Sequence, residues 1–506
     1  MNNESRIFNS ARNLTMSFIQ KLVHIFLTFI GRQIFLQVLS VEYLGVNGLF
    51  ANIFMMLSLA DLGLVTAMSY SFYKPLAEKD ETKLAALIGF YKKIYYIIAA
   101  FVAVAGLSLA PFLRHVINLE NEIPHIEIYY LIALADTVIS YLFVYKATII
   151  TADQKNSIVS KYTVWISILK MVIQITILLT TGNFLFYCSV SIFTTLLNNL
   201  LITKKAVALY PFIKRKVRLD SEDSKNIFTN IKSIFVYRIA NALYYGTDNI
   251  FISALIGTAV VGKYENYQLA VTNLSAIALM AFGSLTPSIG NLVAKERPEK
   301  RMSIFITMQT ISCWLAGFFG FCLFFLLDDF VVLWLGGSFI FDFYTKLAIL
   351  INFYLALTLY PIVAFREATG IYQKTKYVVA AGAALKIIFS IIFGMYWGLP
   401  GIVFATTSSR LLTYAWYEPK ILFRDFLGGR AADYAIGHLI NFTLMSACIA
   451  FTYFIIPLYE CAGWAQWLVK AVVCAVLINA VYFARYFKTK EFKEIVIITK
   501  RLLIKR

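Results

Sequence analysis

The amino-acid sequence predicts an all-α membrane protein with about fourteen transmembrane helices. Of its 506 residues, 60% are hydrophobic and only 15% are charged, and the mean hydropathy is +0.72. Soluble domains carry about 25% charged residues, and a water-soluble core cannot absorb this much apolar surface. Apolar runs such as 94–113, 304–327 and 442–458 match the ~17–25 residues that cross a hydrocarbon layer.

Apolar runs between polar breaks place the expected spans along the chain. The first run carries Lys21, His24 and Arg32 without a small-residue cleavage site behind it, so we expect no removable signal peptide. The six cysteines form no CxxC pair, so neither a disulfide framework nor a zinc site is expected. The spans are expected near residues 11–31, 43–72, 86–112, 126–145, 162–181, 184–203, 231–256, 264–290, 303–327, 345–365, 377–396, 399–417, 435–457 and 463–484.

The net charge of +18 reflects an excess of basic residues, and these are unevenly distributed between the two sides of the membrane. With a cytoplasmic N-terminus, the even-numbered connections between spans are also cytoplasmic, and they carry most Lys and Arg residues. The opposite connections hold essentially Arg32, Arg114, Lys263 and Lys346. This positive-inside pattern predicts that both termini are cytoplasmic, and it accounts for the charge without a nucleic-acid partner. The cytoplasmic residues are Lys74, Lys79, Lys83, Lys155, Lys204, Lys205, Lys214, Arg215, Lys216, Arg218, Lys295, Arg297, Lys300, Arg301, Arg366, Lys374, Lys376, Lys420, Arg424 and Arg430.

The longest cytoplasmic connection divides the chain into two groups of expected spans, followed by a final pair. Each group opens with an Ile-Phe pair, at Ile7 and Ile227, and each second span begins with a Gly-x-aromatic step, at Gly48 and Gly262. Repeated halves with a site between them are a common transporter architecture. The expected divisions are an N-lobe at 1–204, a cytoplasmic linker at 205–230, a C-lobe at 231–418, two further spans at 419–487 and a basic cytoplasmic tail at 488–506.

The first span has a polar face, on which Asn13, Ser17, Lys21, His24, Thr28 and Arg32 recur at steps of three or four residues. Charges at bilayer depth cost roughly 2.5–3.5 kcal/mol each unless they face water or partners. The seventh expected span repeats the pattern from Asn230 through Asn241 to Asp248. We expect these faces to line one hydrated cavity, or else to form interhelical hydrogen-bonding seams.

Within the expected spans, basic residues outnumber acidic residues, which indicates an anionic ligand. Arg offers phosphate a bidentate contact and Lys a point charge. Asp61 and Asp248 are expected to hold a coupling proton or sodium ion, or to form salt bridges with Lys21 or Arg238. No catalytic residue, metal site or cofactor is expected. The candidate residues for binding an anionic head group are Lys21, His24, Arg32, Arg238, Asn241, Lys386 and Arg410.

Six short segments, taken together and in this order, carry a resemblance to a known family. The chain resembles the bacterial polysaccharide-repeat flippases, the O-antigen and capsule transporters of the multidrug/oligosaccharidyl-lipid/polysaccharide exporter (MOP) superfamily, over nearly its whole length. The segments are Leu57–Gly63 (LSLADLG), Tyr70–Asp80 (YSFYKPLAEKD), Tyr91–Tyr95 (YKKIY), Thr247–Ser253 (TDNIFIS), Glu367–Lys376 (EATGIYQKTK) and Trp416–Lys420 (WYEPK).

The resemblance implies two six-helix lobes around a central cavity, two extra C-terminal helices, and alternating access in the bacterial cytoplasmic membrane. The implied substrate is an undecaprenyl-pyrophosphate-linked oligosaccharide repeat unit for surface polysaccharide biosynthesis. Membrane lipids and polysaccharide polymerase or ligase machinery are the expected partners of a monomer.

Two other functions stay open at this point. An ion-coupled multidrug antiporter of the same superfamily would share the fold, but cationic drugs favour an acidic, aromatic cavity over a basic one. A membrane-embedded polysaccharide polymerase or transferase usually needs clustered His, Asp and Glu residues that act as acid and base. We therefore expect a transporter and not an enzyme.

Overall fold

The computed structural model describes residues 3–58, 64–119, 123–283, 296–455, 461–494 and 496. Every regular element within these ranges is helical, and none of the described residues forms a strand. A helix satisfies all its backbone hydrogen bonds within one segment, which is the requirement for a chain surrounded by hydrocarbon. The prediction of an all-α membrane protein is confirmed.

Contacts divide the chain into two compact units, Met1–Gly262 (unit 1) and Lys263–Arg506 (unit 2). The division falls inside one helix, whereas the sequence placed the end of the N-lobe at 204 and the start of the C-lobe at 231. The helices that follow residue 220 contact the second and third helices of the chain, and this packing groups them with unit 1.

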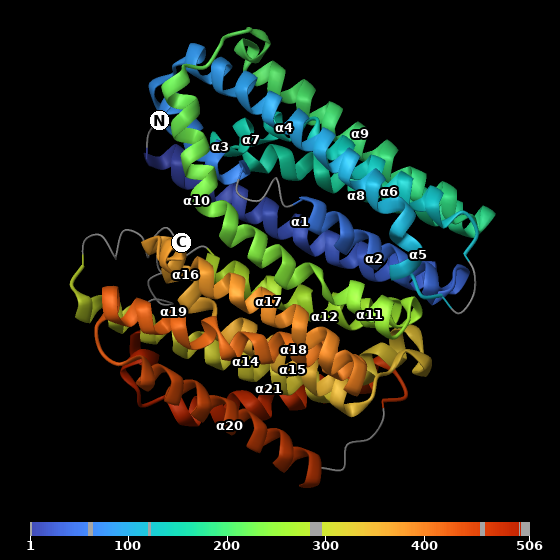
Figure 1. Cartoon of the computed structure of the whole chain (residues 1–506). Coiled ribbons are helices and arrows are strands. Elements are labelled where there is room, and N and C mark those ends of the chain that lie inside the picture. Colours follow the sequence, from blue (N-terminus) through green and yellow to red (C-terminus); the bar gives the residue numbers. More distant parts are fainter. Residues whose placement is uncertain are drawn as a thin grey trace. The chain divides into compact units, whose positions relative to one another are not determined.

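Unit 1 is a helical bundle in which several long helices pack side by side. Helix α8 contacts both α1 and α9, and α6 packs on both α4 and α9 (Figure 1). Its elements are α1 (Asn3–Val38), α2 (Val41–Leu57), α3 (Leu64–Glu78), α4 (Glu81–Leu109), η2 (Ala110–Phe112), α5 (Leu113–Val116), α6 (Ile126–Tyr141), α7 (Val144–Ala152), α8 (Asn156–Thr181), α9 (Phe184–Leu209), η3 (Pro211–Lys214), α10 (Ser221–Gly246), α11 (Asp248–Leu255) and the start of α12 (Thr258–Gly283).

Unit 2 is organised around one long helix, α14, which contacts α15, α20 and α21. The helices α17 and α18 pack closely, and α18 also contacts α15. After the remainder of α12, the elements are α14 (Pro298–Leu335), η4 (Gly337–Phe339), α15 (Phe343–Thr358), α16 (Tyr360–Thr369), α17 (Tyr372–Trp397), α18 (Leu399–Leu412), α19 (Tyr414–Leu422), η5 (Phe423–Leu427), α20 (Ala431–Ile455) and α21 (Trp464–Tyr486).

Within the described residues, nine helices are long and apolar enough to cross a membrane, or up to ten if one bent pair counts as a single span. That pair, α6 and α7, bends by 44° within the expected span 126–145. The expected span 43–72 corresponds to two helices, since α2 ends at Leu57 and α3 begins at Leu64. The total of fourteen spans and the cytoplasmic location of both termini stay predictions.

Most residues of the expected cytoplasmic linker at 205–230 lie in helices. Helix α9 continues to Leu209, and α10 begins at Ser221. The side chain of Asp220 accepts a hydrogen bond from the Ser221 backbone N–H, and acidic residues follow in the first turn of α10. Negative charge at a helix N-terminus is stabilising, so this polar sequence starts a helix long before its apolar residues begin.

Two glycines allow α2 and the start of α12 to approach closely in unit 1. A Cβ atom at Gly45 would overlap the backbone carbonyl of Thr258, and a Cβ atom at Gly262 would overlap that of Val41. Small residues at such crossings bring helix backbones together, which strengthens van der Waals packing in a membrane.

We expect Gly45→Ala to lower the apparent melting temperature of the detergent-solubilised protein by several degrees. Overpacking a tight contact costs about 1–3 kcal/mol, and here the obstacle is backbone that a side-chain rotation cannot move away. Gly31→Ala is the matched control, because no atom lies within 4 Å of a Cβ atom at Gly31. Equal melting temperatures for the two variants would contradict the close crossing.

Candidate functional site

The polar face predicted for the first span lies on α1 in unit 1. Lys21 and Arg32 are half-buried, whereas His24 is exposed. Ser17 accepts a hydrogen bond from Asn156 on α8, with Nδ2 and Oγ 3.4 Å apart. The hydroxyl of Thr28 donates to the backbone carbonyl of His24 at 2.7 Å. Part of the face therefore packs against α8, as an interhelical seam does, and part carries charge.

Cationic residues from a second helix join this face. Lys21 on α1 and Lys170 on α8 both act electrostatically on His24. The carboxylate of Asp136 on α6 acts in turn on Lys170, and one of its oxygens is buried without a hydrogen-bond partner among the described residues. The positive charge of Arg32 interacts electrostatically with the hydroxyl of Tyr187 on α9. We call Lys21, His24, Arg32 and Lys170 the α1 cationic face.

The remaining candidates of unit 1 are only partly placed. Asp61 lies outside the described residues, and Arg238 lies on α10 with its side chain outside them. Asn241 is half-buried on α10, and the half-buried Asp248 is the first residue of α11. The next residue, Asn249, donates to the carbonyl of Gly48 at 3.3 Å, which fixes the start of α11 against α2.

Lys386 and Arg410 belong to unit 2, on the adjacent helices α17 and α18, and their side chains are 1% and 3% exposed. The guanidinium of Arg410 donates to the hydroxyl of Tyr414 at 3.1 Å and to the carbonyl of Asn352 at 3.4 Å. The Asn352 side chain accepts from Thr407 and donates to the carbonyl of Val403, both at 2.7 Å. Arg410 thus takes part in a hydrogen-bonded seam between α15 and α18.

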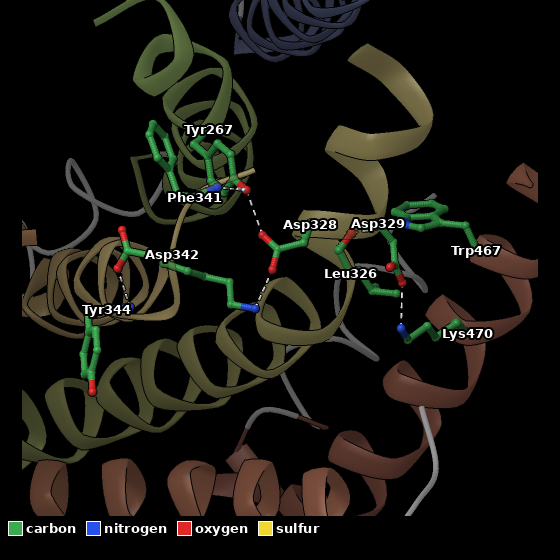
Figure 2. A network of polar contacts seen from close by, with 10 residues as sticks. Tyr267, Leu326, Asp328, Asp329, Phe341, Asp342, Tyr344, Trp467 and Lys470 are labelled. Atoms are coloured by element: carbon green, nitrogen blue, oxygen red, sulfur yellow. Dashed lines mark hydrogen bonds and ion pairs between the residues drawn. The ribbon is translucent and has the colours of Figure 1, made fainter. Parts of the chain in front are cut away.

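Sequence reasoning did not single out two adjacent acids near the end of α14, Asp328 and Asp329, which form ion pairs on opposite sides (Figure 2). Asp328 pairs with Lys346 of α15 at 2.5 Å and accepts from the hydroxyl of Tyr267 of α12 at 2.8 Å. Asp329 pairs with Lys470 of α21 at 2.6 Å. One dipeptide therefore links α14 to three other helices.

This arrangement shows how a basic residue within an expected span is neutralised. Lys470, which lies inside the expected span 463–484, is 8% exposed and pairs with Asp329. The signal in the sequence was the pair of acids that directly follows the apolar run 304–327. Buried charges require partners, so two acids at that depth indicated two basic residues elsewhere in the chain.

Another buried ion pair joins one of the segments that carry the family resemblance to the residue that directly precedes another. Arg366, which directly precedes the segment Glu367–Lys376, lies 2.9 Å from both carboxylate oxygens of Glu418 in the segment Trp416–Lys420. Their side chains are 8% and 3% exposed. Close by in sequence, Lys374 pairs with Asp425 of η5 at 2.8 Å. These segments therefore have a structural role, because their ion pairs connect α16 with α19 and α17 with η5.

Comparison with solved structures places this helix arrangement among known folds. A structure described as lipid II flippase MurJ in an inward closed conformation matches with a TM-score of 0.67 and 12% identity, over 95% of this chain and 100% of that one. An inward-facing multidrug resistance MATE family transporter of the MOP superfamily matches with a TM-score of 0.57 and 16% identity, over 85% and 95%. This chain has the fold of MOP superfamily transporters.

A further structure with the MOP fold is described as a transporter from Pyrococcus furiosus whose reversed binding-pocket polarity suggests a different function. It matches with a TM-score of 0.55 and 15% identity, over 87% of this chain and 96% of that one. No family model matches the sequence, and no curated protein is significantly similar to it. The likeness is therefore one of fold, and it does not identify the substrate of this chain.

We expect Asp329→Asn and Lys470→Met each to lower the stability of the detergent-solubilised protein by about 3 kcal/mol, because each leaves a buried charge without its partner. The double variant should recover most of the loss, since neither charge then remains. Apparent melting temperatures of the four proteins form a double-mutant cycle. Additive effects of the two substitutions would contradict the ion pair.

The cluster around Asp425 predicts a pH dependence of stability. Hydrogen bonds from Arg424 and Lys374 hold the pKa of Asp425 at about 2, below its ordinary value of 3.8. A carboxyl whose pKa is lower in the folded state stabilises the fold above its unfolded pKa, and this contribution is lost as the pH falls from about 4 towards 2.

The two cations beside Asp425 are largely exposed, so the effect should be at most about 1 kcal/mol. Melting temperatures of the native protein should therefore fall more steeply between pH 5 and 2.5 than those of Asp425→Asn. Parallel pH profiles for the two proteins would contradict the assignment.

Proposed function

We propose that this protein is a transporter that moves a lipid-linked, anionic oligosaccharide across the bacterial cytoplasmic membrane by alternating access. The proposed substrate is an undecaprenyl-pyrophosphate-linked repeat unit for O-antigen, capsule or exopolysaccharide. The observation that carries the proposal is the α1 cationic face, which gathers Lys21, His24 and Arg32 on a membrane-spanning segment with Lys170 beside it.

The charge balance of this face supports an anionic ligand. Among the described residues, Asp136 is the acid that acts on Lys170, and the α1 cationic face carries three cationic side chains and a histidine. Several positive charges gathered on one membrane-spanning segment are costly unless water, a polar partner or an anion meets them. A pyrophosphate attached to a lipid supplies both negative charge and a reason to approach from the membrane.

The MOP fold agrees with transport, and one of the solved structures with this fold is named as a lipid II flippase. That name supports a lipid-linked substrate for this chain. Asp61 and Asp248 remain the proposed residues for a coupling proton or sodium ion. No enzymatic step is proposed.

A multidrug antiporter is the second candidate, because other structures with the MOP fold are multidrug resistance transporters. Cationic drugs are repelled by basic side chains, so the α1 cationic face disfavours them. Polarity distinguishes the two functions better than the fold does, because one fold supports many chemistries.

The test is transport in proteoliposomes that contain a fluorescent polyprenyl-pyrophosphate oligosaccharide. We expect Lys21→Ala and Lys170→Ala each to lower the flipping rate about tenfold or more, because a hydrogen bond to a charged group contributes about 1.5–3 kcal/mol. Lys161→Ala is the matched control. Lys161 is an exposed residue of α8, as is required of a control, and it lies on the side of the helix opposite to Lys170.

Correct folding is checked by the melting temperature of each variant, which should match that of the native protein within a few degrees. Native flipping rates in both Lys21→Ala and Lys170→Ala would contradict the proposal. Cation efflux that depends on these lysines, without any flipping of the lipid, would favour the antiporter instead.

A further inference from the structure

A second basic feature lies in unit 1, apart from the α1 cationic face. It is a pocket of about 870 Å³ formed by α4, α7, the end of α9, η3 and the segment that leads to α10. Lys92, Lys93 and Lys146 line it from the helices, and Lys214, Arg215, Lys216 and Arg218 line it from the segment. No acidic side chain is among the lining residues. We call these seven residues and the space between them the basic pocket.

Nearby acids compensate little of this charge. Glu81 forms an ion pair with Arg215 at 3.1 Å, and Asp223 forms its ion pair with Lys83, which lies outside the pocket. The other six basic residues of the pocket have no ion pair within the part of the chain that the structure describes. Positive charges that line one pocket repel one another, and a bound anion would relieve the repulsion.

The segment that carries four of these residues is held in place. Tyr210 directly precedes η3, and its hydroxyl donates a hydrogen bond to Asp153, the residue that follows α7, at 2.7 Å. Phe212 and Leu219 are buried, at 7% and 9% exposure, whereas the basic residues between them are exposed. Apolar anchors at both ends therefore present a fixed row of cations to the pocket, and a preorganised site loses less entropy when a ligand binds.

The position of the pocket along α4 indicates how deep it lies. The long uninterrupted apolar run of this helix begins at Ile94, directly after Lys92 and Lys93, so we infer that the two lysines lie near the membrane surface. Tyr96 lines the pocket as well, and Lys92 lies over its ring at 5.4 Å. Tyrosine and lysine are typical of the membrane–water interface, where lipid phosphates lie.

Beyond Tyr96, α4 offers a surface for lipid chains. Ile97, Phe101 and Val104 are 68%, 56% and 69% exposed and recur at steps of four and three residues along the same span. The basic pocket thus continues into an apolar helix face. A soluble anion would use only the first of these features, whereas a phospholipid uses both.

We propose that the basic pocket binds the phosphate-bearing head group of an anionic glycerophospholipid, with the lipid chains along the exposed face of α4. Basic pockets at the cytoplasmic side of transmembrane helices bind such head groups, and the charge distribution predicts that this end of the unit is cytoplasmic. The site is distinct from the proposed transport residues, because none of the α1 cationic face lines it. The lipid acts as a bound partner of unit 1 and not as cargo.

The test measures phosphatidylglycerol binding to the full chain in detergent by native mass spectrometry, with phosphatidylcholine as the neutral lipid. The pocket variant K92Q/K93Q/K216Q should bind phosphatidylglycerol at least tenfold more weakly, because each basic residue near an anionic lipid adds to the attraction. The control variant K161Q/K204Q/K300Q removes the same number of charges at exposed positions outside the pocket and should bind like the native protein.

Several outcomes would overturn the proposal. Native phosphatidylglycerol binding by the pocket variant, or an equal loss in the control variant, would show that net charge and not the pocket governs binding. Full competition by inorganic phosphate or pyrophosphate at equal concentration would assign the pocket to a soluble anion. Melting temperatures equal to that of the native protein establish that the variants are folded. Native flipping rates in the pocket variant would show that the loss of lipid binding is independent of the proposed transport residues.

Discussion

The cost of placing a charge or an unpaired backbone group in hydrocarbon governs this structure. Helices satisfy the backbone, and several charges within unit 2 are met by partners of opposite sign. Asp328 and Asp329 divide their partners between α15 and α21, and Arg366 pairs with Glu418 between α16 and α19. Two of these pairs join helices that do not follow each other in the sequence, so the pairs help to hold the bundle of unit 2 together.

The cationic residues of unit 1 follow a different rule. The α1 cationic face and the basic pocket each gather several positive side chains, and no acidic side chain lines the basic pocket. One lies on a spanning segment and the other at the end of one, where α4 becomes apolar. We propose phosphate-bearing ligands for both places, because phosphate offers Lys and Arg strong charge-assisted hydrogen bonds.

The fold alone does not choose a substrate. Structures with the MOP fold are named as a lipid flippase, as multidrug transporters and as a transporter with reversed pocket polarity. What differs between such functions is the charge of the lining residues, because a cationic drug and a pyrophosphate require opposite surroundings. The proposal of an anionic substrate for this chain therefore depends on the lysines and the arginine of the α1 cationic face.

The sequence by itself determined the all-α membrane class, the sites of most long helices and the polar face of α1, since these depend on local hydropathy and a period of 3.6 residues. It did not show that the expected span 43–72 is two helices, that the linker at 205–230 is mostly helical, or that Asp328 and Asp329 pair with Lys346 and Lys470. Only the tertiary structure decided those partners and the basic pocket, because they join residues that no periodicity connects. A charge pattern reveals that a partner is needed, but packing selects the residue that supplies it.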